Sequence, residues 1–169
     1  TGACIRHYIA LGHKRIALLG GDGFVLNENS REQGYLDGMN QYGLGEYIYP
    51  FTVGQNAHEG EAALVKLMSM KIERPTALIC YNDLIALGAM KMLREMGMSV
   101  PGDIAVLGCD NLFFGPYLEP GLTSVDLRAE EIANYAMNLL TQAQEKPLEA
   151  FGRMFESQLI IRRSCGFGL

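Results

Sequence analysis

The stretch "TALICYNDLIALGAMKMLREMG", residues 76–97, joins a short apolar run to an apolar helical pattern without a glycine or proline at the junction. Residues 76–81 predict a buried strand, because the run is short, continuous and apolar. Residues 83–97 predict a helix that ends at a glycine. An amide and a carboxylate, Asn82 and Asp83, stand at the seam between the two elements. A strand that passes directly into a helix through polar residues indicates an α/β domain with a functional edge at this seam.

The same alternation of strands and helices extends outward in both directions. Further strands are predicted at 15–20, 47–51, 103–110 and 156–163, and further helices at 4–13, 31–43, 61–68 and 129–142. Continuous apolar strands that alternate with helices are typical of a parallel sheet covered on both faces. We therefore predict an α/β fold with a doubly wound parallel sheet. The opening helix has no strand before it, so we expect the domain to continue upstream of this chain.

Composition limits the classes of function. The 169 residues suffice for one ordinary domain or two small lobes, and the 49% hydrophobic content predicts a real core. The net charge of -5 argues against a nucleic-acid surface within the chain, because phosphate binding needs clustered Lys and Arg. The 4 cysteines are scattered without metal-ligand spacing, and no apolar run approaches a membrane span. We expect no cofactor, no membrane contact and a cytoplasmic protein with free thiols.

Polar side chains follow three of the predicted strands. Arg31 opens the helix after the first strand, Asn82 follows the strand at 76–81, and Asp110 ends the strand at 103–110. Because the carboxyl ends of parallel strands share one edge, these side chains should converge on a cleft. An arginine fork, an amide and a carboxylate suit a small polyhydroxylated or polar ligand.

Each of these residues also has a purely structural interpretation. Asp83 is expected to cap the helix at 83–97, which leaves Asn82 to face the cleft. Asp110 either contacts ligand or begins an Asx turn. Arg31 lies in the first turn of a helix whose cap is Ser30, where a cation opposes the helix dipole at a cost of about 0.3–1 kcal/mol. That position favours a ligand contact, and the alternative is an arginine that swings out to solvent.

The sequence shows no recognisable motif of catalytic residues. The "GGDG" run at 20–23 lacks the GxGxxG spacing of a dinucleotide loop. His7, His13 and His58 stand without a second ligand or a nucleophile, and surface or capping roles suit them better. Nothing pairs a nucleophile with a base, so we predict that the chain is not an enzyme.

An exposed apolar surface is predicted on the outer side of the helix at 83–97 and on the loop "NLFFGPYLEPGL", residues 111–122. A helix that is apolar all round is buried on two sides, and so much aromatic surface is unusual in a loop of a monomer. The pattern predicts self-association, and the alternative is a loop that folds back onto its own core. The candidate interface residues are Leu84, Leu87, Gly88, Phe113, Phe114 and Tyr117.

Four quoted segments carry a family likeness: "LGHKRIALLGG", "SREQGYLDGM", "YNDLIALGAMKMLREMGMSVPGDIAVLGCDN" and "YLEPGLTSV". In order and spacing they resemble the effector-binding domain of lactose-repressor-type (LacI/GalR) bacterial transcription regulators, over nearly the whole chain. The resemblance implies a type I fold similar to periplasmic sugar-binding proteins, with two lobes around a cleft. It also implies a homodimer through the apolar side of the helix at 83–97 and the loop at 111–122. DNA contact is implied only through a helix-turn-helix headpiece outside these residues.

The resemblance further implies one complete lobe and part of a second. Residues 20–123 and the final strand and tail at 151–169 would form the complete lobe. The opening helix within 1–19 and a return helix within 124–150 would belong to the incomplete one.

For the ligand site, the resemblance implies a set that matches the residue-based argument. The family arginine, in its R-x-x-G setting, corresponds to Arg31, and the family asparagine and aspartate correspond to Asn82 and Asp110. Asn27, in the loop before Arg31, is added to the candidates. Gln55 stands where the family places an aromatic side chain that stacks on the ligand, a departure that bears on the ligand's identity.

Taken together, the pattern and the resemblance predict the effector-sensing core of a bacterial transcriptional regulator that binds a sugar or sugar derivative. One alternative is a sugar-binding protein of a transport or chemosensory system, which would share the cleft but be secreted and monomeric. A second is an enzyme on a doubly wound sheet, which would need a nucleophile, metal or phosphate loop. The upstream sequence separates the first two, because one predicts a helix-turn-helix there and the other a signal peptide.

Overall fold

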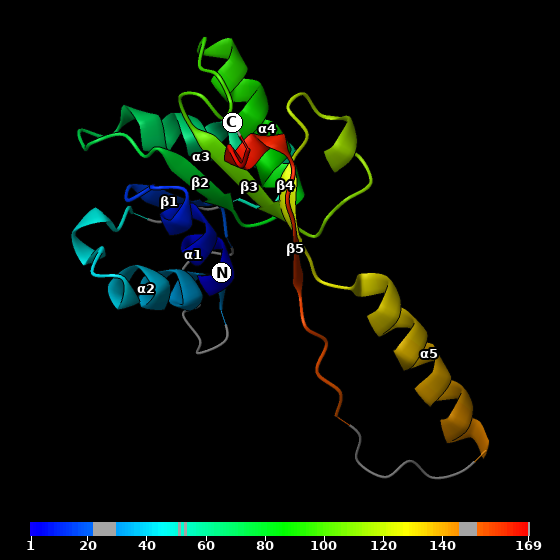
Figure 1. Ribbon diagram of the computed structural model, residues 1–169. Helices are drawn as coiled ribbons and strands as arrows, with labels where there is room; N and C mark the ends of the chain where they lie inside the picture. Colours follow the sequence, from blue (N-terminus) through cyan, green and yellow to red (C-terminus); the bar gives the residue numbers. More distant parts are fainter. Residues whose placement is uncertain (22–29, 51, 53, 146–151, 169) are drawn as a thin grey trace.

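The computed structural model describes residues 1–21, 30–50, 52, 54–145 and 152–168, which contain a five-stranded sheet in the order β1-β2-β3-β4-β5 (Figure 1). Strands β1 to β4 are parallel, and β5 runs antiparallel to β4. The strands are β1 Ile16–Leu19, β2 Ala77–Cys80, β3 Ala105–Cys109, β4 Thr123–Asp126 and β5 Gln158–Ile160. The helices are α1 Gly2–Ala10, α2 Arg31–Gln41, α3 Ala57–Ser69, α4 Asp83–Glu95 and α5 Ala129–Glu145, with the short 3-10 helices η1 Gly45–Tyr47, η2 Gly115–Tyr117 and η3 Arg163–Cys165.

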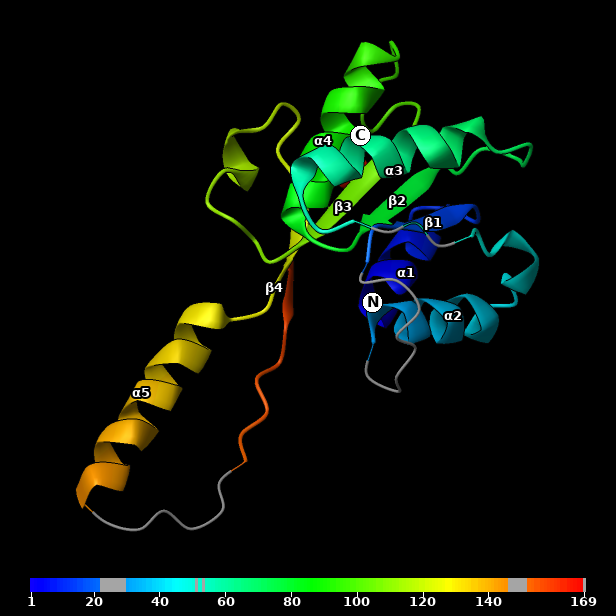
Figure 2. The same cartoon turned by 180° about the vertical axis from the view of Figure 1, so that it is seen from behind.

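Helices cover both faces of the sheet. Helices α3 and α4 lie on one face, while α1 and α2 lie on the other (Figures 1 and 2). Alternate side chains of a strand point to opposite faces, so Ala17 and Leu19 of β1 join the core under α3 and α4, and Ile16 and Leu18 join the core under α1 and α2. Every residue of β1, β2 and β3 is buried. The predicted doubly wound parallel sheet is therefore confirmed.

Helix α1 lies in a different place from the one expected. Cys4, Ile5 and Tyr8 are buried in the core that α1 shares with α2 and the sheet. The Tyr8 hydroxyl donates to the carbonyl of Leu78 in β2 at 3.0 Å, and Ile5 packs where Gly38 of α2 has no side chain. The assignment of the opening helix to an incomplete lobe is wrong. Its apolar stripe predicts burial but carries no information about which sheet the helix covers.

Helix α5 extends away from the sheet (Figure 1). Its apolar side chains Ile132, Met137 and Leu140 are exposed. Strands β4 and β5 form the antiparallel pair at one edge of the sheet, and α5 follows β4 in the chain. The division of the remaining chain at residues 123, 150 and 151 stays a prediction.

Two local expectations are wrong. The predicted strand at 47–51 is replaced by η1 and an irregular segment, in which the Tyr49 amide donates to the Tyr35 hydroxyl at 3.2 Å and Pro50 has no amide to donate. Strand β4 was not predicted, because buried Thr123 and Ser124 interrupt its apolar pattern. Their hydroxyls find tertiary partners, which is what makes polar residues acceptable in a buried strand.

Candidate functional site

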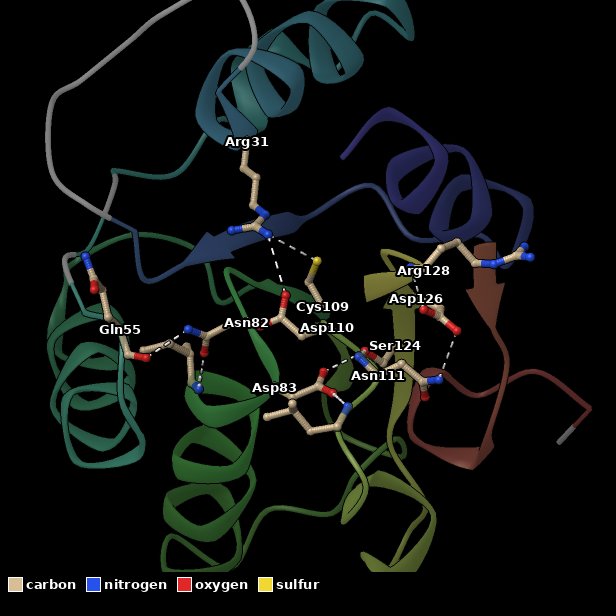
Figure 3. Close-up of polar contacts among 12 residues, drawn as sticks. Arg31, Gln55, Asn82, Asp83, Cys109, Asp110, Asn111, Ser124, Asp126 and Arg128 are labelled. Carbon is tan, nitrogen blue, oxygen red and sulfur yellow. Dashed lines mark hydrogen bonds and ion pairs between the residues drawn. The ribbon is translucent and has the colours of Figure 1, made fainter. Parts of the chain in front are cut away.

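The carboxyl ends of β1, β2 and β3 meet at one edge of the sheet, where Figure 3 shows the polar side chains. Arg31 reaches this edge from the first turn of α2, Asn82 from the start of α4, and Asp110 from the end of β3. The structure thus brings Arg31 and Asp110 together, with 3.7 Å between the guanidinium Nη2 and Oδ1 of the carboxylate. The convergence expected from strand polarity is present.

Arg31 is held in place over the edge of the sheet. Ser30 caps α2 through a 3.0 Å bond from the amide of Gln33, as predicted, and this fixes the helix start from which Arg31 projects. The guanidinium lies 4.3 Å from the centroid of the Tyr81 ring, and its Nη2 lies 3.4 Å from Sγ of Cys109. Among the described residues, the sulfur, the ring and the Asp110 carboxylate are close neighbours of the guanidinium, whose five N–H donors suit a planar acceptor.

Asp110 occupies an uncommon backbone conformation at the end of β3, with φ 107°. Partial burial raises the pKa of its carboxyl above the ordinary value, and the charge of Arg31 opposes that rise. The adjacent Cys109 thiol has its pKa raised by burial to about 11, against the lowering effect of Arg31. The thiol is therefore neutral at physiological pH, and the anion that faces Arg31 is the Asp110 carboxylate.

The cap role expected of Asp83 belongs to Asn82 in the structure. Asn82, not Asp83, caps α4, because its Oδ1 accepts from the amide of Ile85 at 2.8 Å. The Asn82 Nδ2 donates to the carbonyl of Gln55 at 2.8 Å. Asn82 is only partly buried at the edge of the site. That its side chain also contacts a ligand stays a prediction.

Asp83 points into the protein instead of capping the helix. It is fully buried, and its two carboxylate oxygens accept from the Ser124 hydroxyl and the Leu112 amide, each at 2.6 Å (Figure 3). Burial raises the pKa of Asp83, while these two hydrogen bonds favour the ionised form. The expected cap role for Asp83 is wrong because tertiary donors outcompete the local helix amides.

The other two ligand candidates lie in less informative positions. Gln55 is exposed in the turn before α3, where its amide donates to Oε2 of Glu59 at 2.7 Å. Asn27 falls outside the described residues. The ligand roles of Gln55 and Asn27 stay predictions.

A cavity of about 190 Å³ lies beside Arg31 at the edge of the sheet. Its walls come from α1, the sheet and the segments that flank α5, and apolar side chains and thiols dominate them. The lining residues are Thr1, Cys4, Leu18, Arg31, Ile79, Cys80, Gly108, Cys109, Val125, Leu127 and Ser157. Arg31 therefore stands between an apolar hollow and the Asp110 carboxylate.

Two neighbours of the site were not singled out from the sequence. Tyr81 lies under the guanidinium of Arg31, and Cys109 contacts it edge-on. Both directly precede a predicted site residue, Asn82 and Asp110. Position at the carboxyl end of a strand is the signal that was available, and it applies to the last strand residue as well as to the next one.

Of the six candidate interface residues, three are exposed, two are partly buried and one is buried. Phe113 and Tyr117 each expose 85% of their surface, and Leu84 is exposed on α4. Gly88 is buried against α3, where an added Cβ would overlap the carbonyl oxygen of Ala57. Its assignment to the outer surface is wrong, because the apolar pattern of α4 does not tell the helix-packing side from the exposed side.

A hollow of about 570 Å³ lies between α4 and the loop that contains η2. Leu87, Met90 and Lys91 line it from α4, and Tyr117 and Leu118 line it from the loop. Phe113 and Phe114 meet edge to face at 5.8 Å between ring centroids next to it. Leu118 of the loop packs against the core under α3 and α4, while Phe113 and Tyr117 stay exposed.

Other kinds of site are absent from the part of the chain that the structure describes. No group of three or more His, Cys, Asp or Glu side chains in it is arranged to hold a metal ion. No helix among the described residues combines the length and apolar character needed to cross a membrane.

Comparison with known proteins identifies the family of this chain. The family model described as periplasmic binding protein-like domain matches residues 5–165. The HTH-type transcriptional regulator GalR of Escherichia coli (strain K12) is 34% identical over 161 residues, which cover 94% of this chain and 47% of GalR. The chain thus spans about half the length of the curated relatives that it matches.

Solved structures agree with the sequence relatives. The Escherichia coli transcriptional repressor AscG is 28% identical with a TM-score of 0.84, covering 96% of this chain and 59% of that chain. A sugar-binding transcriptional regulator of the LacI family from Escherichia coli, complexed with phosphate, is 27% identical with a TM-score of 0.81, covering 96% of this chain and 59% of that chain. Transcriptional regulators are therefore found both among the sequence relatives and among the solved structures with this fold.

Proposed function

This chain belongs to the periplasmic binding protein-like domain family, in the form found in LacI/GalR-type transcriptional regulators, and on that premise we propose that it senses a small polar effector. The effector is a sugar or sugar derivative, and it binds in a cleft at the carboxyl edge of the sheet. The observation that carries the proposal is the Arg31 and Asp110 pair at that edge, 3.7 Å apart and only half-buried. A planar donor beside a carboxylate acceptor matches the hydroxyl groups of a sugar.

The contacts around Arg31 support ligand binding over a purely structural ion pair. The distance of 3.7 Å to Asp110 is longer than a hydrogen bond, so the two groups keep capacity for a ligand that bridges them. The Tyr81 ring and the apolar cavity wall offer a surface for the less polar face of a sugar ring. Asn82 adds an amide at the rim of the same edge.

Signalling would pass through a dimer in the cytoplasm to helix-turn-helix headpieces that lie outside this chain. The exposed Phe113 and Tyr117, beside the hollow on α4, support a self-association surface. An effector shifts a two-state equilibrium only by its difference in affinity for the two states, typically about 1–3 kcal/mol. The exposed apolar side of α5 supports a second lobe that would pack there and close over the ligand.

The experiment is a binding screen by NMR on the isotope-labelled chain. A panel of monosaccharides, with inorganic phosphate as an anion probe, is titrated into the wild type, Arg31→Ala and Arg6→Ala, an exposed arginine on α1 that serves as the matched control. We expect a monosaccharide to shift the resonances of residues 31, 81 and 110, and its affinity to fall at least tenfold in Arg31→Ala but not in Arg6→Ala. A sugar that binds both variants equally well would remove Arg31 from the site and refute this proposal.

A further inference from the structure

Strand β3 ends in two successive residues with positive φ, Asp110 at 107° and Asn111 at 50°. Residues with a side chain visit this region rarely, and Asp at 107° lies outside even the small left-handed well. Such a conformation persists only where the surroundings over-determine it. The structure must therefore hold this turn by contacts that outweigh its strain.

Three consecutive backbone amides, at residues 110–112, are each fixed by a hydrogen bond, two of them to residues of β4 and one to a residue of α4. The first donates to the carbonyl of Val125 at 2.9 Å, and the second donates to Oγ of Ser124 at 3.0 Å. The third donates to Oδ2 of Asp83 at 2.6 Å. The Ser124 hydroxyl in turn donates to Oδ1 of Asp83 at 2.6 Å. Ser124 of β4 and Asp83 of α4 are thus a linked pair that holds the turn by hydrogen bonds.

The linked pair is built into the core. Both Asp83 and Ser124 have 0% exposure. The carboxylate fits beside β3 because residue 108 is a glycine, where a Cβ would overlap Oδ1 of Asp83. Helix capping does not explain this carboxylate, since Asn82 supplies the α4 cap. Its partners Leu112 and Ser124 lie 29 and 41 residues away, so the contact is tertiary in origin.

We propose that Asp83 and Ser124 are positioning residues for Asp110, locking the strained turn so that the Asp110 carboxylate faces the Arg31 guanidinium. Neither Asp83 nor Ser124 lines the cavity beside Arg31, and their hydrogen bonds reach Asp110 through the backbone of residues 110–112. This inference rests on the proposed function only for the meaning of the Arg31 and Asp110 pair. The locking itself is a property of the chain without ligand.

The test measures whether Asp110 still senses Arg31 when the lock is removed. Among the described residues, the charged or titratable groups that interact with Asp110 are Arg31 on α2, Asp83 on α4 and Cys109 on β3. The pKa of Asp110 is read from the pH titration of its carboxyl ¹³C resonance, in the wild type and in Arg31→Gln. We expect Arg31→Gln to raise the Asp110 pKa, because the arginine charge favours the ionised carboxylate.

The lock is then removed by Ser124→Ala, which leaves every charge in place. We expect the upward shift caused by Arg31→Gln to be lost or at least halved in the Ser124→Ala background. Ser164→Ala is the matched control, because Ser164 is equally buried and its hydroxyl also bridges two strands, accepting from Thr123 and donating to Val106, away from the turn. The shift should be unchanged in that background.

An equal Arg31→Gln shift in the wild type and in Ser124→Ala would overturn the proposal. If Ser124→Ala does not fold, Asp83→Asn replaces it. The Asp110 pKa is then compared between Asp83→Asn and the double variant with Arg31→Gln. Both proteins lack the Asp83 charge, so its loss does not affect the difference. Failure of the proposed function has a different signature. There a monosaccharide would bind regardless of Arg31→Ala, while the coupling between Arg31 and Asp110 would still depend on Ser124.

Discussion

The guanidinium of Arg31 lies over the aromatic ring of Tyr81, with 4.3 Å between its central carbon and the ring centroid. This contact joins the first turn of α2 to the residue that follows β2. A cation above an aromatic face is stabilised by about 0.5–1 kcal/mol at an exposed site. The ring thus pre-orders the group that we propose meets the effector, and it offsets part of the helix-dipole cost of an arginine at the start of a helix.

Tyr81→Leu should release Arg31, whereas Tyr81→Phe should not, because only the ring face is needed for the contact. The measurement is the rate at which phenylglyoxal modifies Arg31, located by mass spectrometry. We expect the rate to rise about two- to fivefold in Tyr81→Leu, in line with the loss of about 0.5–1 kcal/mol. Equal rates in the leucine variant and the wild type would show that the ring does not hold the arginine.

Asp110→Asn should stabilise the lobe at neutral pH, because the carboxylate is an acid whose folded-state pKa is raised by burial. Such a group contributes stability that is present below its unfolded-state pKa, about 3.9, and is lost as pH rises through the higher folded-state pKa. The advantage of the asparagine variant should therefore shrink as pH falls through the ordinary carboxyl range. Urea unfolding at several pH values measures it.

A relaxed backbone is a second source of stability in Asp110→Asn, since asparagine also tolerates positive φ. That contribution does not vary with pH, so the pH dependence separates the two. A gain in the free energy of unfolding that is the same from acid to neutral pH would contradict the pKa argument. The relaxed backbone would then be the whole source of the added stability.

Gly88→Ala should destabilise the chain by about 1–3 kcal/mol, because the new methyl group would overlap the backbone carbonyl of Ala57 across the α3 and α4 contact. The free energy of unfolding in urea is the readout. Gly2→Ala is the control, since residue 2 begins α1 with open space around it. That variant should be neutral or slightly stabilised, and an unchanged stability in Gly88→Ala would mean that α4 does not approach α3 through this residue.

Phe113→Ser and Tyr117→Ser together should weaken self-association without lowering stability, because both side chains are 85% exposed in the single chain. Sedimentation velocity across a concentration series gives the dissociation constant. Val65→Ser, at an exposed apolar position on α3, is the control and should leave association unchanged. A double variant that associates like the wild type would exclude this loop from the interface.

Local patterns in the sequence predict most of the fold and the outline of the site. Continuous apolar runs identify β1, β2 and β3, and helical spacing identifies α2, α3 and α4, because strand and helix periods differ strongly. Strand polarity then predicts that Arg31 and Asp110 meet, since parallel strands end at one edge. Strand β4 escapes this reasoning, because its buried hydroxyls are satisfied by residues far along the chain.

The sequence by itself determined the alternation of strands and helices, the parallel sheet and the edge at which the polar side chains gather, because these depend on periodicity and on the direction of the chain. Only the tertiary structure decided which of Asn82 and Asp83 caps α4, which sheet α1 covers and which side Gly88 faces. In each case the local sequence pattern is compatible with both outcomes. The difference comes from distant partners such as Ser124, and their positions exist only in the folded chain.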